Sequence, residues 1–155
     1  MAWTNSKLFT ATVTDMMNNT TAIDANSDTF RVALFTNAIT PDQTVASAST
    51  AFGAGVWAAN EVFDAAEWPT GGEALTAVTS TFASNVYTFD AANTVSTGTS
   101  ATLLTFFGCL VYDDTIAAPV ANQGWAFIYL GGTQSLTDGT LTILWAASGI
   151  STLTL

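Results

Sequence analysis

Four carboxylates and two tryptophans occur close together along the chain, and these residue types could serve carbohydrate chemistry. The set is Trp57, Glu61, Asp64, Glu67, Trp68 and Glu73. Glycosidases use two carboxylates beside the scissile bond, and tryptophan rings can stack on sugars. Glycosidase chemistry requires a particular distance between the two carboxylates, and that distance is set by the fold. A tryptophan beside a turn commonly packs against its own chain and binds no sugar. We therefore expect no enzyme and keep a carbohydrate-binding module as an alternative.

Two pairs of aspartates could supply oxygen ligands to Ca²⁺: Asp24 with Asp28, and Asp113 with Asp114. Carboxylate oxygens are the ligands that Ca²⁺ prefers in proteins. Neither pair follows the D-x-[DN]-x-[DN]-G spacing of an EF-hand loop, and aspartate is also a favoured turn residue. We predict no metal and no other cofactor.

The chain has no histidine, and its only basic residues are Lys7 and Arg31. Histidine is the common acid or base because its pKa lies near neutrality, so a Ser-His-Asp triad is excluded. Cys109 lacks the partner that a nucleophilic thiolate needs, and we predict that it is a small buried hydrophobe. The net charge of −10 repels nucleic acids and anionic membranes, so we expect neither as a partner. Residues 1–19 lack the apolar run of a signal peptide, which favours a soluble protein made in the cytoplasm.

These residues must be positioned by one short N-terminal helix and a series of strands. Phe9, Val13, Met16 and Met17 recur at the spacing of one helix face, which predicts a helix at about 6–17. Two asparagines directly after this segment would end the helix.

Short β-favouring runs follow the helix and are separated by Gly, Pro and Asp turns. Their ranges are 29–36, 55–63, 73–80, 85–90, 102–113, 125–131, 139–146 and 150–155. Short strands at this spacing predict a mainly β chain, folded as an antiparallel β-sandwich or jelly roll. No linker, charge block or internal repeat interrupts residues 1–155, so we predict a single domain.

Two of the predicted strands are apolar on both faces. Residues 125–130 place Trp125, Phe127 and Tyr129 on one side and three aliphatic residues on the other, and the run 103–112 is similar. A sandwich strand ordinarily has one polar face. Two apolar faces indicate either a strand buried between layers, for example beneath the helix, or a strand covered by another subunit.

A series of short motifs runs through most of the chain. They are T-N-x-x-T-P at 36–41, N-E-V at 60–62, a Gly pair at 71–72, G-x-x-V-Y-D at 108–113 and W-x-x-x-G-I at 145–150. This order, after a short helix, resembles small virion proteins of tailed bacteriophages, especially those of actinobacterial hosts. The resemblance implies a β-sandwich that decorates or completes the capsid. Its partners would be the major capsid protein and copies of itself, with a trimer favoured, and it would have no catalytic residues.

We expect such a protein to be synthesised in the host cytoplasm and to bind the capsid exterior, because packaged DNA would repel an acidic chain. Aromatic anchors supply much of the binding energy of interfaces. Candidate anchors are apolar residues beyond the needs of one core, namely Trp3, Leu8, Phe9, Trp125, Phe127 and Tyr129. A phage tail component, such as a tube or tip subunit or a host-recognition module, is the first alternative function, ahead of the carbohydrate-binding module.

Overall fold

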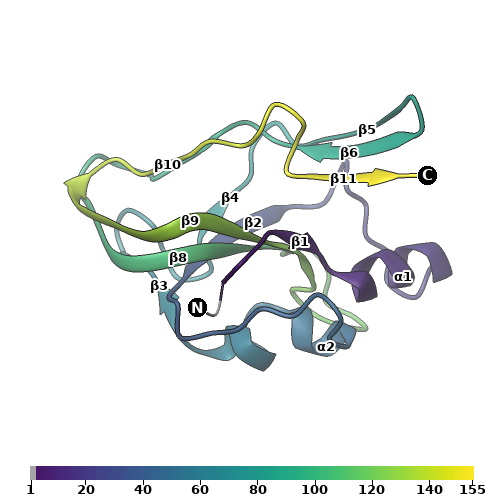
Figure 1. The fold of residues 1–155 in the computed structure, drawn as a ribbon, viewed down its shortest axis with the longest axis horizontal. Helices are drawn as coiled ribbons and strands as arrows, with labels where there is room; N and C mark the ends of the chain where they lie inside the picture. Colours follow the sequence, from purple (N-terminus) through teal and green to yellow (C-terminus); the bar gives the residue numbers. More distant parts are fainter. Residues whose placement is uncertain (1–2) are drawn as a thin grey trace.

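The computed structural model describes residues 3–155, apart from the side chain of Leu104. The fold is mainly β with antiparallel sheets and a short N-terminal helix; 39% of its residues lie in strands and 11% in helices. Figure 1 shows a central sheet with further strands on one side and the short helix α2 on the other. The predicted mainly β class is confirmed.

The central sheet has the strand order β1-β9-β8-β2-β3, and β4 also pairs with β2. Its strands are β1 (Lys7–Leu8), β2 (Phe30–Phe35), β3 (Glu61–Val62), β4 (Glu73–Ala74), β8 (Ala101–Asp113) and β9 (Gly124–Gly139). Every pairing in this sheet is antiparallel, and the long strands β8 and β9 form its centre together with β2.

Two smaller antiparallel sheets lie above the central sheet in Figure 1, one ordered β11-β6-β5 and the other β10-β7. Their strands are β5 (Thr79–Ala83), β6 (Val86–Asp90), β7 (Thr94–Val95), β10 (Thr142–Ile143) and β11 (Ser151–Thr154). The helical segments are α1 (Thr10–Asn18), α2 (Ser47–Thr50) and a 3-10 turn η1 (Gly55–Ala58).

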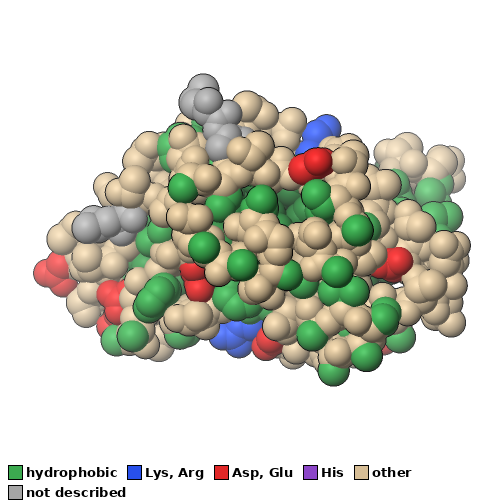
Figure 2. All heavy atoms as spheres, turned by 90° about the horizontal axis from the view of Figure 1, so that it is seen from below, with side chains coloured by type: hydrophobic (Ala, Val, Ile, Leu, Met, Phe, Trp, Pro, Cys, Tyr) green, Lys and Arg blue, Asp and Glu red, His purple; other side chains and the backbone are tan. Residues whose placement is uncertain are grey.

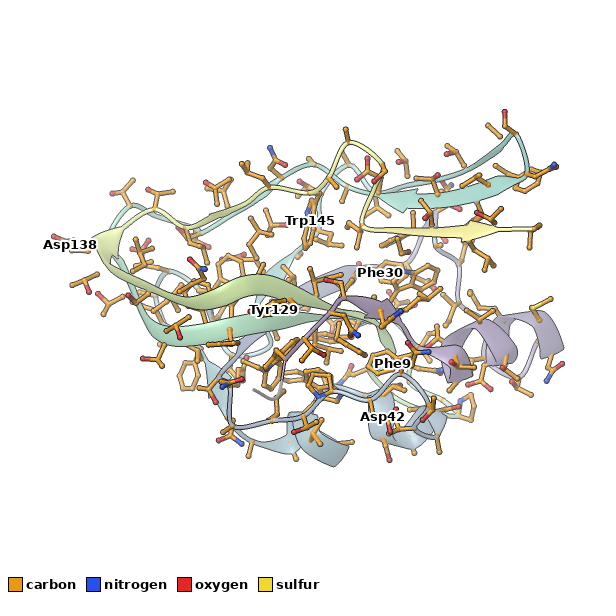
Figure 3. The ribbon with its side chains drawn as sticks, in the orientation of Figure 1. Phe9, Phe30, Asp42, Tyr129, Asp138 and Trp145 are labelled. Carbon is orange, nitrogen blue, oxygen red and sulfur yellow. The ribbon has the colours of Figure 1, made fainter. Side chains whose placement is uncertain are left out.

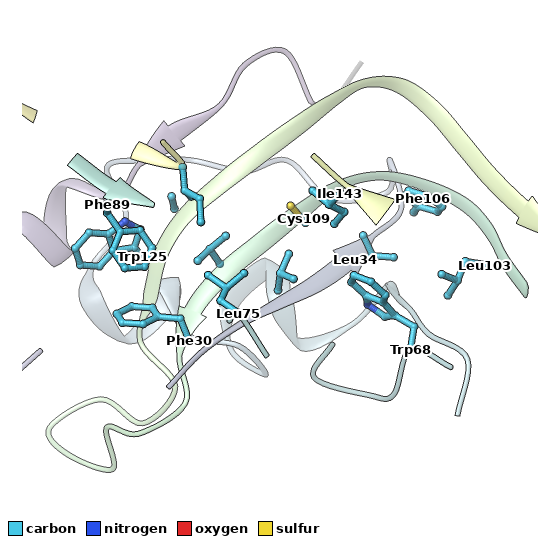
Figure 4. Close-up of a cluster of buried hydrophobic side chains, with 14 of the residues drawn as sticks. Phe30, Leu34, Trp68, Leu75, Phe89, Leu103, Phe106, Cys109, Trp125 and Ile143 are labelled. Carbon is cyan, nitrogen blue, oxygen red and sulfur yellow. The ribbon is translucent and has the colours of Figure 1, made fainter. Parts of the chain in front are cut away.

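One apolar cluster fills the space between the central sheet and the smaller sheets (Figure 4). From β2 it takes Phe30, Val32 and Leu34, and from the smaller sheets it takes Phe89 and Ile143. The rings of Phe30 and Phe89 lie 4.8 Å apart. Burying these side chains is the main stabilisation that joins the layers.

A second apolar cluster covers the opposite face of the central sheet. The alternate β2 residues Ala33 and Phe35 belong to it, together with Ile39 and Trp57 from the segment 36–60. The rings of Phe35 and Trp57 lie 5.0 Å apart in an edge contact. In Figure 3, Phe9 of this cluster and Phe30 of the first lie on different sides of the central sheet.

These two clusters explain why the predicted strands are apolar on both faces. The central strands are buried between layers of their own chain, and no second subunit is needed to cover them. The second face of the central sheet is covered chiefly by the segment 36–60, which includes α2 and η1. The sequence had suggested the N-terminal helix as the covering element.

The N-terminal helix starts later than predicted. Residues Lys7 and Leu8 are extended and pair with Phe127 and Ala126 of β9, and α1 begins only at Thr10. Phe9 is extended at the N-cap because its ring enters the second cluster. The predicted apolar face is only partly correct: Phe9 is buried and Met16 packs against the first cluster, but Met17 is 77% exposed and Thr12 is the buried residue of α1.

A β-bulge changes the side of the central sheet on which the Trp125 side chain lies. The register between β8 and β9 shifts from Val111↔Ala126 to Tyr112↔Gly124, which leaves Trp125 as an extra residue. Trp125 therefore packs in the first cluster against Phe30, while Phe127 joins the second. The prediction that both rings share one face is wrong for this reason.

Four strand predictions also need correction. The range 73–80 is divided between β4 and the start of β5. The range 55–63 forms η1 and the short β3, because Gly55 has a φ of +53° that starts a turn and Trp57 is drawn into the core. β9 continues through Gly131 and Gly132, whose positive φ values permit an irregularity in the ladder where a turn was predicted. Of the range 139–146, only β10 is a strand.

Candidate interaction surface

Four of the six predicted anchors lie in the core of the chain itself. Trp3, Phe9, Trp125 and Phe127 are between 0% and 3% exposed. Trp3 lies against Gly108, and its indole N–H donates to the carbonyl of Thr36 at 3.0 Å. A ring with no exposed area cannot anchor a partner, so in this fold these four residues stabilise the monomer.

The remaining two predicted anchors, Leu8 and Tyr129, are partly exposed at the open edge of the central sheet. Leu8 lines a groove of about 330 Å³ between β1 and β11. Tyr129 lines the neighbouring hollow, and its backbone N–H donates to the hydroxyl of Ser6 at 3.0 Å. Of the six predicted anchors, these two are therefore the ones that a partner could still contact, at this edge of the sheet.

A larger groove lies elsewhere, between α1 and the β11-β6-β5 sheet, and we call it the helix–hairpin groove. Its volume is about 750 Å³. In Figure 1 it corresponds to the region where α1 lies below β11 and the β5–β6 hairpin. Its lining residues are Val13, Met16, Met17, Asn19, Ala22, Ile23, Asp24, Ala25, Ser80, Phe82, Tyr87, Leu153 and Leu155.

The groove gathers large apolar side chains that face solvent. Met17 is 77% exposed, Phe82 is 60% exposed and Leu155 is 73% exposed. Asp24 is its only charged side chain. Exposed apolar patches of this kind commonly mark interaction sites, because single scattered hydrophobes are ordinary but gathered ones are not.

Local sequence explains how the groove is built. Asn19 adopts the left-handed conformation and closes the C-terminus of α1 with backbone hydrogen bonds to Asp15 and Met16, which turns the chain beneath the hairpin. Ser84 and Asn85 both have positive φ, as a two-residue hairpin turn requires, and so project Phe82 beside that turn. Sequence reasoning missed this site because Met17 was assigned to a buried helix face.

The rest of the surface carries few charges. Figure 2 shows one face of the molecule, on which small apolar patches are scattered among polar atoms and the acidic groups are well separated. Arg31 is held by Asp114 at 3.8 Å and donates to the carbonyl of Gly72 at 2.7 Å. Solubility of such a chain rests on its net negative charge and on neutral polar groups.

The candidate carbohydrate residues do not assemble into a sugar site. Trp57 is 2% exposed and Trp68 is fully buried, and they belong to different clusters on the two faces of the central sheet. A tryptophan must present its ring to stack on a sugar. The structure therefore places both in packing roles.

The four carboxylates near these tryptophans hold loops in place. Glu61 accepts from the backbone N–H of Gly71 at 2.7 Å, and Asp64 accepts from the N–H of Thr102 at 2.9 Å. Burial raises the pKa of Glu61, whereas hydrogen bonds from Thr102 and Ala66 lower the pKa of Asp64. Two further bonds are Thr97 hydroxyl to Glu73 at 2.7 Å and Ser100 hydroxyl to Glu67 at 3.3 Å.

The candidate calcium residues divide between turns and one pair, in which Asp113 is buried and Asp28 is half-buried. Asp24 accepts from the N–H of Asn26 at 3.0 Å in a local turn, and Asp114 lies near Arg31. Asp28 and Asp113 face each other. Within residues 3–155, no group of three or more His, Cys, Asp or Glu side chains is arranged to hold a metal ion.

Cys109 is fully buried in the first cluster, which confirms its predicted packing role. Burial raises the pKa of its thiol to about 12. Among the described residues, α1, α2 and η1 are all too short or too polar to cross a lipid bilayer as helices.

Comparisons with known proteins add no relative: no family model matches this chain, and neither curated proteins nor solved structures gave a match. The resemblance to phage virion proteins therefore stays a prediction.

Proposed function

We propose that this protein is a structural subunit of a virus particle, namely a capsid decoration or minor capsid protein of a tailed bacteriophage. The observation that supports it best is the helix–hairpin groove, where Met17, Phe82 and Leu155 present apolar surface to solvent. A protein that works by assembling needs such a surface, since burial of apolar area drives association.

Three of the motifs that carry the resemblance lie in strands or directly before them. The Gly pair 71–72 precedes β4, the motif at 108–113 is the end of β8, and the motif at 145–150 leads into β11. We also propose that the central sheet and the smaller sheets together form the β-sandwich that the resemblance implies, with the first cluster as its core.

The mechanism that we propose is physical. A subunit that binds only the assembled shell stabilises that shell by mass action. An interface of about 1,600 Å² suffices when it contains buried apolar anchors. The net charge of −10 favours the outer surface, away from packaged DNA, after synthesis in the host cytoplasm. Self-association into a trimer would present the groove several times to the same shell.

The experiment compares particles of the phage that carries this gene with particles from which the gene has been deleted. The proposal predicts that deleted particles still assemble heads, but release their DNA at a lower temperature. Adding the purified protein back restores the higher temperature. Deleted particles that lack tails but have fully heat-stable heads would contradict decoration and indicate a tail component.

A further inference from the structure

Two carboxyl groups, those of Asp28 and Asp113, meet where β2 begins and β8 ends. Phe30 is the register partner of Asp113, so Asp28 lies just beyond the end of the ladder. Two more hydrogen bonds tie the segments together. The N–H of Thr29 donates to the Thr115 hydroxyl at 2.7 Å, and the N–H of Asp114 donates to the carbonyl of Thr29 at 2.8 Å. The backbone therefore keeps the two carboxyl groups in contact.

One carboxyl oxygen of Asp113 lacks a donor. Asp113 is fully buried, and its Oδ1 accepts from the backbone N–H groups of Thr115 at 2.8 Å and Ile116 at 3.3 Å. Its Oδ2 is buried and receives no N–H or O–H from any described residue. Asp28 Oδ2 already accepts from the N–H of Asp24 at 2.6 Å. Two ionised carboxylates offer only acceptors, so they can hydrogen bond to each other only if one carries a proton.

The surrounding charges also oppose ionisation of both groups. Asp24 lies on the same loop as Asp28, and Asp114 follows Asp113 directly. Arg31 on β2 is directed to Asp114, at 3.8 Å. From α1, Asp15 accepts from the side-chain amide of Gln123, and the backbone carbonyl of Gln123 accepts from the N–H of Asp113. Among the described residues, Arg31 forms its ion pair with Asp114 and not with either member of the pair, and like charges disfavour a second ionisation.

We propose that the buried carboxyl group of Asp113 keeps a proton that it donates to Asp28, and that loss of this proton is a pH-sensitive switch that loosens the segment 24–29 from the segment 113–116. The switch reaches the surface because Asp24 and Ala25 line the helix–hairpin groove. Release of the segment 24–29 therefore changes one wall of that groove. The switch itself does not depend on what binds there.

The direction of the pH effect follows from linkage. Burial, followed by the interaction with Asp28, raises the pKa of Asp113 to about 7, whereas a free aspartate titrates near about 4. Between these values the folded state holds a proton that the unfolded state has lost. Stability therefore falls as pH rises through this range, and levels off above about pH 7.

The test is the melting temperature measured from about pH 5 to about pH 8 for the wild-type protein and for Asp113→Asn. The wild type should lose several degrees over this range. The neutral amide of Asp113→Asn should donate to Asp28 permanently, so its melting temperature should be nearly constant and higher at pH 8. Asp138→Asn, at an exposed tip of the molecule (Figure 3), is the matched control and should follow the wild type.

A second measurement needs no variant. The side-chain carboxyl carbon of Asp113, followed by ¹³C NMR in the wild-type protein, should titrate near pH 7. Titration of Asp113 below about pH 5, or an Asp113→Asn variant with the same pH slope as the wild type, would overturn the proposal.

Discussion

Gly72 is the residue at which the backbone approach is tightest. It has a φ of +76°, and a Cβ there would collide with the backbone of Val32 and Ala33 on β2. We predict that Gly72→Ala destabilises the fold by more than about 3 kcal/mol, through backbone clash and conformational strain together. Urea unfolding measures this loss.

Gly131→Ala is the matched control for that substitution. Gly131 also has a positive φ, of +83°, but a Cβ there would meet open space. Only the conformational cost of about 1 kcal/mol applies. Equal losses for the two variants would show that the close approach of Gly72 to β2 has no energetic importance.

Cys109 gives a second prediction at the residue scale. Because it is fully buried and burial raises its thiol pKa to about 12, almost no thiolate is present or accessible at neutral pH. A thiol reagent such as DTNB should react with the native protein only as fast as the protein unfolds. Rapid stoichiometric labelling of the folded protein would contradict this burial.

At the scale of elements, the sequence predicted best where alternation and turn signals agree. The ranges 29–36, 85–90 and 150–155 closely match β2, β6 and β11. The range 55–63 failed, because burial of Trp57 overrides the local β preference and winds the chain into η1. A strand propensity is only a weak preference when tertiary packing opposes it.

The candidate surface was harder to predict than the strands. Trp125 changed face because a bulge adds one residue to β9, and no local pattern marks such a bulge. Met17 fitted the helical period, yet α1 starts late and turns Thr12 inward. Choosing candidate anchors by their aromatic character therefore picked residues of the core. The exposed groove could not be predicted in this way, because it forms where α1 and the β5–β6 hairpin meet in the fold.

The helix–hairpin groove yields a prediction for these two elements together. Replacing Met17 and Phe82 by Ser should change stability by only about 0.5 kcal/mol for each residue, because both side chains are exposed. Affinity for the shell should fall at least about tenfold, because truncating an anchor costs more than 1 kcal/mol. Unfolding curves and binding isotherms separate the two effects.

Phe63→Ser is the control for these groove variants. Phe63 is 51% exposed but lies outside the helix–hairpin groove. It removes a comparable exposed apolar side chain, so it should leave affinity for the shell unchanged. An equal loss of affinity in this variant would assign binding to general surface hydrophobicity.

At the scale of the whole molecule, the fold combines two apolar clusters with a strongly acidic exterior. The net charge of −10 opposes close approach of identical chains, and salt screens this repulsion. We predict that raising the salt concentration strengthens self-association, as light scattering would show. Dissociation by salt would contradict an apolar contact and indicate ion pairs at the interface.

We infer that this protein docks on an assembled shell through its exposed apolar groove. The decisive measurement is sedimentation of the purified protein with empty shells that lack it. We expect saturable binding at a fixed ratio to the major capsid protein, and loss of that binding in the Met17→Ser, Phe82→Ser double variant. Wild-type protein that stays in the supernatant at every shell concentration would contradict it.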